Sequence, residues 1–128
     1  MKPTPASVTS ERQLQDAIVQ AAMLCGWRVH HCRAARSRSG RWATHIQGHA
    51  GFPDLVLARS GVVLLLELKR IGAQMSPDQW AWARELTALR PGWRLGIGAW
   101  WMLATPADLD DVLELLATPS PTSSTTGR

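Results

Sequence analysis

Two short polar runs interrupt an apolar stretch of the chain, and their charged residues are the strongest candidates for chemistry. Asp54 ends the run Gly-Phe-Pro-Asp, and Glu67 and Lys69 follow thirteen and fifteen residues later. Each run adjoins an apolar segment typical of a buried strand, at 55–58 and 62–66. A charged group at the end of a buried strand costs free energy unless a partner compensates it, and a metal ion is a common partner.

The spacing of the two runs predicts that their charges meet. The segment 59–61 is short enough for a hairpin turn, and a two-residue loop at 60–61 places Asp54 directly opposite Glu67. Directly opposed residues of an antiparallel pair have Cβ atoms only about 5 Å apart. Lys69 follows Glu67 by two residues, so it points to the same face. The competing interpretation is a surface hairpin with an Asp in a turn and a Glu–Lys pair at its end.

Two carboxylates and one ammonium at one spot suit metal-assisted phosphodiester hydrolysis. Hard cations such as Mg²⁺ or Mn²⁺ take carboxylate, carbonyl and water oxygens. Asp54, Glu67 and the backbone carbonyl of Leu68 are the predicted ligands. Such a cation polarises a phosphoryl oxygen and lowers the pKa of a bound water. Lys69 is then placed to orient that water or to stabilise charge developing on phosphorus.

At these residues the chain resembles the PD-(D/E)xK nuclease superfamily, and within it the small stand-alone VRR-NUC domain nucleases, many of them encoded by phages. That pattern has an acid on a first helix, Gly-x-Pro-Asp, Glu-x-Lys, and a helix that starts Ser-x-x-Gln. The matching positions here are Glu11, 51–54, 67–69 and 76–79, and the resemblance spans roughly residues 10–104. It implies that Asp54 and Glu67 bind the metal and that Lys69 assists hydrolysis.

The resemblance also implies supporting catalytic roles for Glu11 and Gln79, and each has a simpler explanation. Glu11 falls on the apolar stripe of its helix, close to the metal, but an acid in the first turn is also favourable to the helix dipole. Gln79 is placed to contact a metal-bound water or a phosphate. It also completes a capping box with Ser76, and the sequence favours that interpretation.

The charge distribution predicts a polyanionic partner. Net charge is +4 with a pI near 10.0, and no acidic residue lies between Asp16 and Asp54. Arginines can pair bidentately with phosphate, and a tryptophan can stack on an unpaired base. A loop that is merely solvated, with a tryptophan anchoring it, is the alternative. The predicted DNA-binding residues are Arg33, Arg36, Arg38, Arg41 and Trp42.

Composition limits the remaining classes. The chain of 128 residues is expected to form one nuclease-like domain at 10–117, with a flexible leader at 1–9 and a disordered tail at 118–128. Two cysteines, no secretory leader and no long apolar run favour the reducing cytoplasm of a bacterial host cell over a membrane or an exported protein. The absence of tyrosine excludes phosphotyrosine chemistry, and the Cys and His spacing does not favour structural zinc.

The periodicity predicts an α/β fold of restriction-endonuclease type, with a central mixed sheet flanked by helices in the order α-β-β-β-α-β-β-α. Expected helices cover 11–25, 77–90 and 107–117. Expected strands cover 27–32, 55–58, 62–66, 93–98 and 100–104, with an irregular basic loop at 33–49.

The predicted function is therefore metal-dependent endonucleolytic hydrolysis of DNA phosphodiester bonds, with branched, flapped or nicked DNA as candidate substrates. A catalytically silent nucleic-acid-binding domain and an RNA nuclease are the alternatives, and intact Asp54, Glu67 and Lys69 argue against the first. The resemblance also allows a homodimer, because cleavage of two strands needs two sites.

Overall fold

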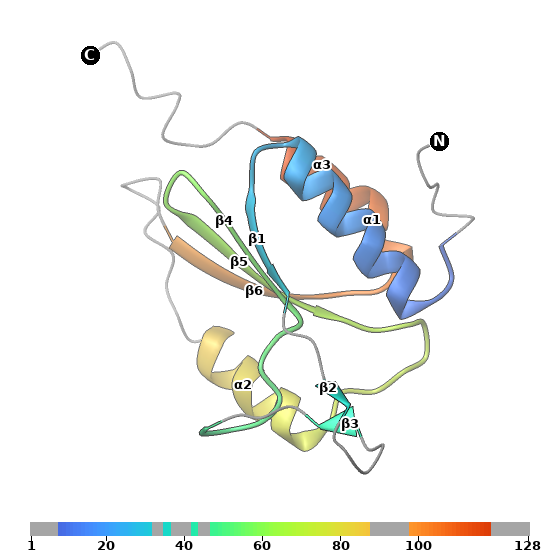
Figure 1. Ribbon diagram of the computed structural model, residues 1–128, viewed down its shortest axis with the longest axis vertical. Coiled ribbons are helices and arrows are strands. Elements are labelled where there is room, and N and C mark those ends of the chain that lie inside the picture. Colours follow the sequence, from blue (N-terminus) through green and yellow to red (C-terminus); the bar gives the residue numbers. More distant parts are fainter. Residues whose placement is uncertain (1–7, 32–34, 37–41, 44–46, 88–97, 119–128) are drawn as a thin grey trace.

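The computed structural model describes residues 8–31, 35–36, 42–43, 47–87 and 98–118 (Figure 1). In this part of the chain the elements are, in order, α1 (Glu11–Leu24), β1 (Arg28–His31), β2 (Ala35–Arg36), β3 (Trp42–Ala43), β4 (Leu55–Arg59), β5 (Val62–Leu68), α2 (Pro77–Thr87), β6 (Gly98–Ala104), a short 3-10 helix η3 (Pro106–Asp108) and α3 (Leu109–Ala117). None of the described helices is long and apolar enough to cross a membrane.

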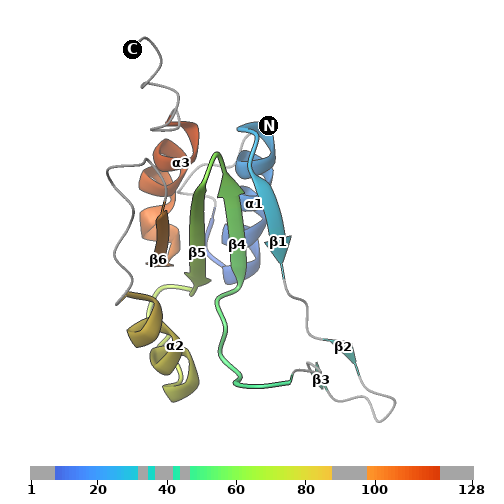
Figure 2. The same cartoon turned by 90° about the vertical axis from the view of Figure 1, so that its left-hand side faces the viewer.

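The main sheet has four strands in the order β1-β4-β5-β6 (Figure 2). Strands β1, β4 and β5 pair antiparallel, whereas β6 pairs parallel to β5. A parallel neighbour needs a long crossover connection, and the one from β5 to β6 contains α2. The central mixed sheet predicted from the sequence is therefore confirmed.

The hairpin between β4 and β5 has the predicted register. Arg59 pairs with Val62 across a two-residue loop. Ser60 and Gly61 both have positive φ, at 51° and 85°. Positive φ at both loop residues is the signature of a type I′ turn, whose twist matches that of the flanking strands. The turn thereby fixes which residues of the two strands lie opposite each other.

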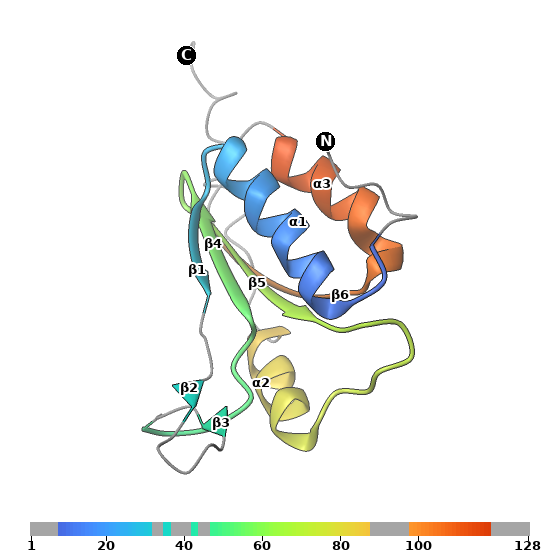
Figure 3. The ribbon, with the colours of Figure 1, turned by 45° about the vertical axis from the view of Figure 1, so that its right-hand side comes forward.

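Helices α1 and α3 lie side by side over one face of the sheet, and α2 lies across the sheet from them, contacting β6 (Figures 1 and 3). Helix α1 begins with the predicted capping box, in which Gln13 N–H donates to the Ser10 hydroxyl and Ser10 N–H donates to the Gln13 side chain. Its buried side is formed by Leu14, Ala17, Ile18 and Ala22.

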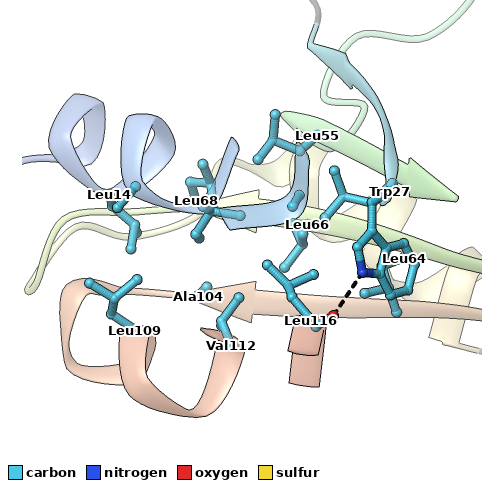
Figure 4. Close-up of a cluster of buried hydrophobic side chains, with 14 of the residues drawn as sticks. Leu14, Trp27, Leu55, Leu64, Leu66, Leu68, Ala104, Leu109, Val112 and Leu116 are labelled. Carbon is cyan, nitrogen blue, oxygen red and sulfur yellow. Dashed lines mark hydrogen bonds between the residues drawn. The ribbon is translucent and has the colours of Figure 1, made fainter. Parts of the chain in front are cut away.

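The core fills the space between these two helices and the sheet (Figure 4). Alternate residues of β5, at Leu64, Leu66 and Leu68, point into it because successive strand side chains point to opposite faces. The intervening residues Leu65 and Glu67 are also buried, although they face the other way. Strand β5 is therefore covered on both faces, and this is why a charged residue within it needs partners.

A polar centre formed around Arg59 lies at the end of the sheet farthest from Glu67. The Arg59 guanidinium donates to the carbonyls of Cys25, Leu116 and Thr118. It also lies 4.4 Å from the Trp27 ring centroid, and the Trp27 indole N–H donates to the Leu116 carbonyl over 2.9 Å (Figure 4). One side chain thus ties the hairpin to the C-terminal ends of α1 and α3.

Several predicted boundaries are corrected by the structure. The basic segment is not wholly irregular, because β2 and β3 pair within it. The predicted strand break near Ala99 is absent, because β6 runs unbroken through 98–104. The last helix starts as the 3-10 turn η3 and becomes α-helical at Leu109. Residues 93–97 of the other predicted strand, and the predicted end of the second helix at 88–90, lie outside the described residues.

Candidate active site

The three candidate catalytic residues converge where β4 begins and β5 ends. Leu55 opposite Leu66 is the last paired position of the hairpin, so Asp54 and Glu67 are the next residues in register. The following position on the β4 side is Pro53, which has no N–H to offer the ladder. Beyond the last paired position, the Asp54 side chain replaces the backbone as hydrogen-bond partner of β5, because its Oδ2 accepts the Leu68 N–H over 2.8 Å.

The backbone of Leu68 faces Asp54. Its side chain is fully buried in the core. Within a strand, the N–H and C=O of one residue point to the same side. Since the Leu68 N–H points to Asp54, its carbonyl also faces that side, whereas the next N–H, of Lys69, donates to Ala104 on β6 over 3.0 Å.

Glu67 is a charged side chain in an almost sealed position, with 1% of its surface exposed. Gln79 Nε2 donates to its Oε2 over 3.1 Å. Its Oε1 is buried and has no hydrogen-bond partner among the described residues. Burial first, and then the adjacent Asp54 carboxyl, raise the pKa of Glu67 to about 8, while the Lys69 charge opposes the shift. Two ionised carboxylates have no donor between them, so Glu67 and Asp54 share a hydrogen bond only when one of them is protonated, and Glu67 Oε1 lacks a partner when both are ionised.

Gln79 forms the predicted helix cap and also contacts Glu67, whereas its predicted contact with a metal-bound water or a phosphate stays a prediction. Its backbone N–H donates to the Ser76 hydroxyl, and its Oε1 accepts the Ser76 N–H over 2.8 Å, which forms the capping box of α2. The remaining amide donor reaches Glu67. The cap therefore holds the amide in the orientation in which its NH₂ points at the carboxylate.

Gly51 allows the segment before β4 to pack directly on the first turn of α2. Its φ is +93°, and a Cβ placed there would lie 2.6 Å from the Asp78 carbonyl carbon and 2.7 Å from the Gln79 nitrogen. No side chain fits at that distance, so the approach requires glycine. The Gly-x-Pro-Asp run thus positions Asp54 and, through α2, Gln79.

Glu11 lies in the first turn of α1, near the same centre. The residue as a whole is exposed, but partial desolvation of the carboxyl and the charge of Asp54 raise its pKa, while Lys69 and Arg70 lower it. The pKa of Glu11 therefore depends on the charges of the site. No group of three or more His, Cys, Asp or Glu side chains in the described ranges is arranged to hold a metal, so its role as a ligand remains a prediction.

The oxygen donors nevertheless suit a hard cation. Mg²⁺ is commonly held by one or two carboxylates while it keeps several waters. Glu67 Oε1 is a buried carboxylate oxygen without a partner among the residues described, and such an atom is stabilised by a cation. Asp54 and the Leu68 carbonyl would complete the donor set predicted from the sequence.

The predicted DNA-binding segment is described only in part. Arg33, Arg38 and Arg41 lie outside the described residues. Arg36 and Trp42 are directly opposed across the β2–β3 pair. This small pair lies at the same end of the molecule as α2 and the start of β4 (Figures 1 and 3).

The sequence predicted neither the close packing of Gly51 on α2 nor the hydrogen bond from Gln79 to Glu67. The available signals were the glycine three residues before Asp54 and the fact that a glutamine carries both an acceptor and a donor.

Comparison with known proteins defines the class of fold. A solved structure described as a VRR_NUC domain matches with a TM-score of 0.52 at 18% identity, over 84% of this chain and 97% of that chain. No family model matches the sequence, and no curated protein does. The chain therefore has a VRR-NUC-like fold of the restriction-endonuclease type. The likeness establishes the fold, and the chemistry rests on the residues described above.

Proposed function

We propose that this protein is a metal-dependent endonuclease that hydrolyses DNA phosphodiester bonds. The observation that carries the proposal is the buried Oε1 of Glu67, which has no partner among the described residues and lies beside the Asp54 carboxyl that accepts the Leu68 N–H. A fold that places the Asp54 carboxyl beside the nearly sealed Glu67 carboxyl incurs a cost in stability. A function that uses the Asp54 and Glu67 carboxyls together is the simplest reason to retain this arrangement.

Each residue has a definite part in the proposed reaction. Mg²⁺ or Mn²⁺, when bound, would polarise the phosphoryl oxygen and supply an acidified water. Asp54 and Glu67 would hold the cation, and Gln79 would keep the Glu67 carboxylate in one orientation. The Lys69 ammonium, whose charge acts on both Glu67 and Glu11, would stabilise negative charge that develops on the phosphate. Glu11, whose pKa responds to Asp54 and Lys69, would help to position that water.

Conservative variants separate chemistry from folding. Asp54→Asn keeps an oxygen to accept the Leu68 N–H, and Glu67→Gln keeps an oxygen for Gln79, so both should fold. Each should lower cleavage by a factor of about 10³ or more, because a ligand charge is lost. Lys69→Met should also slow cleavage but leave Mg²⁺ binding nearly unchanged. Glu114→Gln, at an exposed position of α3, is the matched control and should keep full activity.

The assay uses linear, flapped, nicked and four-way DNA, each with Mg²⁺ or with EDTA. Cleavage that depends on Mg²⁺ and disappears in Asp54→Asn supports the proposal. Full activity in EDTA, or in either carboxylate variant, would overturn the mechanism. If only RNA of the same design is cleaved, the protein is an RNA nuclease. If every substrate is bound and none is cleaved, the protein is a catalytically silent binding domain.

A further inference from the structure

A pocket of about 400 Å³ lies beside the carboxylate site, between the segment that precedes β4 and the outward face of α2. Its volume is in the range of small-molecule sites. The residues that matter for its chemistry are His49, Asp78, Ala81, Trp82, Arg84 and Glu85.

The pocket and the carboxylate site share a wall. Asp78 lines the pocket, and the next residue, Gln79, donates to Glu67. Gly51 packs against the backbone between these two residues from the other side. A nucleic acid whose phosphate lies at Glu67 therefore has its adjacent nucleotides close to the pocket mouth.

The Trp82 indole forms a fixed aromatic wall. Its Nε1–H donates to the His49 carbonyl over 3.3 Å. The ring also meets Phe52 edge-on, with centroids 4.9 Å apart and planes at 88°. A ring held by two contacts loses little freedom when a base stacks on it, and stacking of this kind is a general means of binding unpaired bases.

The charges of the lining favour a base over a phosphate. Asp78 and Glu85 contribute two carboxylates against the single guanidinium of Arg84, so a phosphate would be repelled. Carboxylates accept hydrogen bonds from the exocyclic amino groups of bases, and a guanidinium donates to ring nitrogens and carbonyls. Thymine has no exocyclic amino group and should fit least well.

We infer, on the basis of the proposed nuclease function, that this pocket receives one unpaired, amino-bearing nucleobase next to the phosphate that is cut. A base inside a duplex is stacked and paired, so it cannot enter unless it is extruded. The preferred DNA therefore carries unpaired nucleotides beside the scissile bond, as a flap or a splayed end does.

The test fills the pocket without touching the carboxylates. Ala81 is exposed on α2, and Ala81→Leu keeps a good helix former while occupying the space. Ala117→Leu, at an exposed position of α3, is the matched control. Affinity is measured in Ca²⁺ for a fully paired duplex and for the same duplex with a cytosine flap or a thymine flap. A 2-aminopurine in the flap reports stacking by loss of fluorescence.

The native protein should bind the cytosine flap about ten-fold more tightly than the duplex, and the thymine flap less tightly than the cytosine flap. Ala81→Leu should lose this preference and the 2-aminopurine quenching, while its duplex affinity stays the same. Ala117→Leu should behave as the native protein does. Trp82→Phe should retain part of the preference because an aromatic face remains.

Two results would overturn the pocket assignment: equal affinity of the native protein for flap and duplex, or an unchanged preference in Ala81→Leu. A failure of the nuclease proposal would give a different result in these assays. If no DNA is cut with Mg²⁺ but the flap preference still depends on Ala81, the base pocket stands and the catalytic proposal falls. If DNA is cut but the flap preference does not depend on Ala81, the catalytic proposal stands and the base pocket falls.

Discussion

At the scale of single residues, the requirements of stability and of the proposed function conflict at Glu67. It is one of the most deeply buried side chains of the protein, and one of its oxygens lacks a partner among the described residues. Its surroundings raise its pKa, so the metal-free fold favours the protonated form, whereas a cation needs the carboxylate. Protons and metal should therefore compete for this residue.

Glu67 makes the stability of the metal-free protein depend on pH. Its pKa is raised from 4.5 to about 8 on folding, so the folded state holds this proton more tightly than the unfolded chain does. The resulting stabilisation is complete below about pH 4.5 and is lost as pH rises through about 8. The Tm of the native protein, relative to Glu67→Gln, should therefore fall across this window in EDTA.

The measurement is a series of thermal melts from pH 4.5 to 9.5, with the difference in Tm between native protein and variant plotted against pH. Saturating Mg²⁺ at pH 8–9 should raise the Tm of the native protein and leave that of Glu67→Gln nearly unchanged. Glu114→Gln controls for the loss of an acid at an exposed position. A difference that does not change with pH would contradict the raised pKa.

At the scale of elements, the site depends on how closely the 47–54 segment packs against α2. Gly51 makes the contact, and Gly51→Ala should push the first turn of α2 away and withdraw the Gln79 amide from Glu67. Cleavage and Mg²⁺ affinity should both fall, by about ten-fold or more, since a small misplacement at a site can have a large effect on rate.

Gly72→Ala is a suitable control for that substitution. Gly72 also has positive φ, at +85°, but a Cβ there would meet nothing within 4 Å. It should therefore incur only the backbone penalty of about 1–2 kcal/mol, without loss of activity. Equal effects of the two substitutions on cleavage would mean that strain, and not contact with α2, explains the Gly51 variant.

The elements that could be predicted from the sequence are those specified by local rules. The type I′ turn follows from Ser60 and Gly61, and the two helix starts follow from capping boxes. The unbroken β6 depends on distant pairing instead. The sequence predicts a strand end at Gly98, whereas β6 begins there, because Gly98 pairs in parallel with Val62 of β5 although glycine weakens strands.

The candidate site divides in the same way. The register of the hairpin was sufficient to bring Asp54 and Glu67 together, because strand periodicity is strict. The sequence could not reveal that Gly51 lies against Asp78, because that contact joins segments linked only through the tertiary fold. It also did not predict that Gln79 caps α2 and donates to Glu67 at the same time, because the second contact joins two elements that only the tertiary fold brings together.

At the scale of the whole molecule, the polar centre at Arg59 holds together the end of the sheet away from the site. Arg59→Ala would leave carbonyls at the ends of α1 and α3 without their charged donor and remove the cation over Trp27. A loss of about 2 kcal/mol is expected, which corresponds to a fall in Tm of roughly 5–10 °C. Cleavage per folded molecule at low temperature should not change, because the substitution is remote from Glu67. A loss of activity without a loss of Tm would show that this end takes part in the reaction.

The charge of the whole molecule leads to the last prediction, which separates DNA binding from catalysis. The chain carries a net charge of +4, and the acid-free segment between Asp16 and Asp54 concentrates its arginines. If this segment holds the DNA backbone, replacing Arg36, Arg38 and Arg41 together with glutamine should weaken affinity. It should also reduce the slope of log K against log salt by about one unit for each lost phosphate contact.

These variants should cut DNA almost normally when protein is saturating, because their arginines would position the substrate without touching the reacting phosphorus. The salt series is best measured in Ca²⁺, beside a control in which Arg12, Arg90 and Arg128 are replaced instead, so that the net charge is equal. If both triple variants lower the slope equally, general attraction by the positive charge explains the binding. If only the first does, the contacts belong to the acid-free segment, whose described β2–β3 pair lies at the same end of the molecule as α2 (Figure 3).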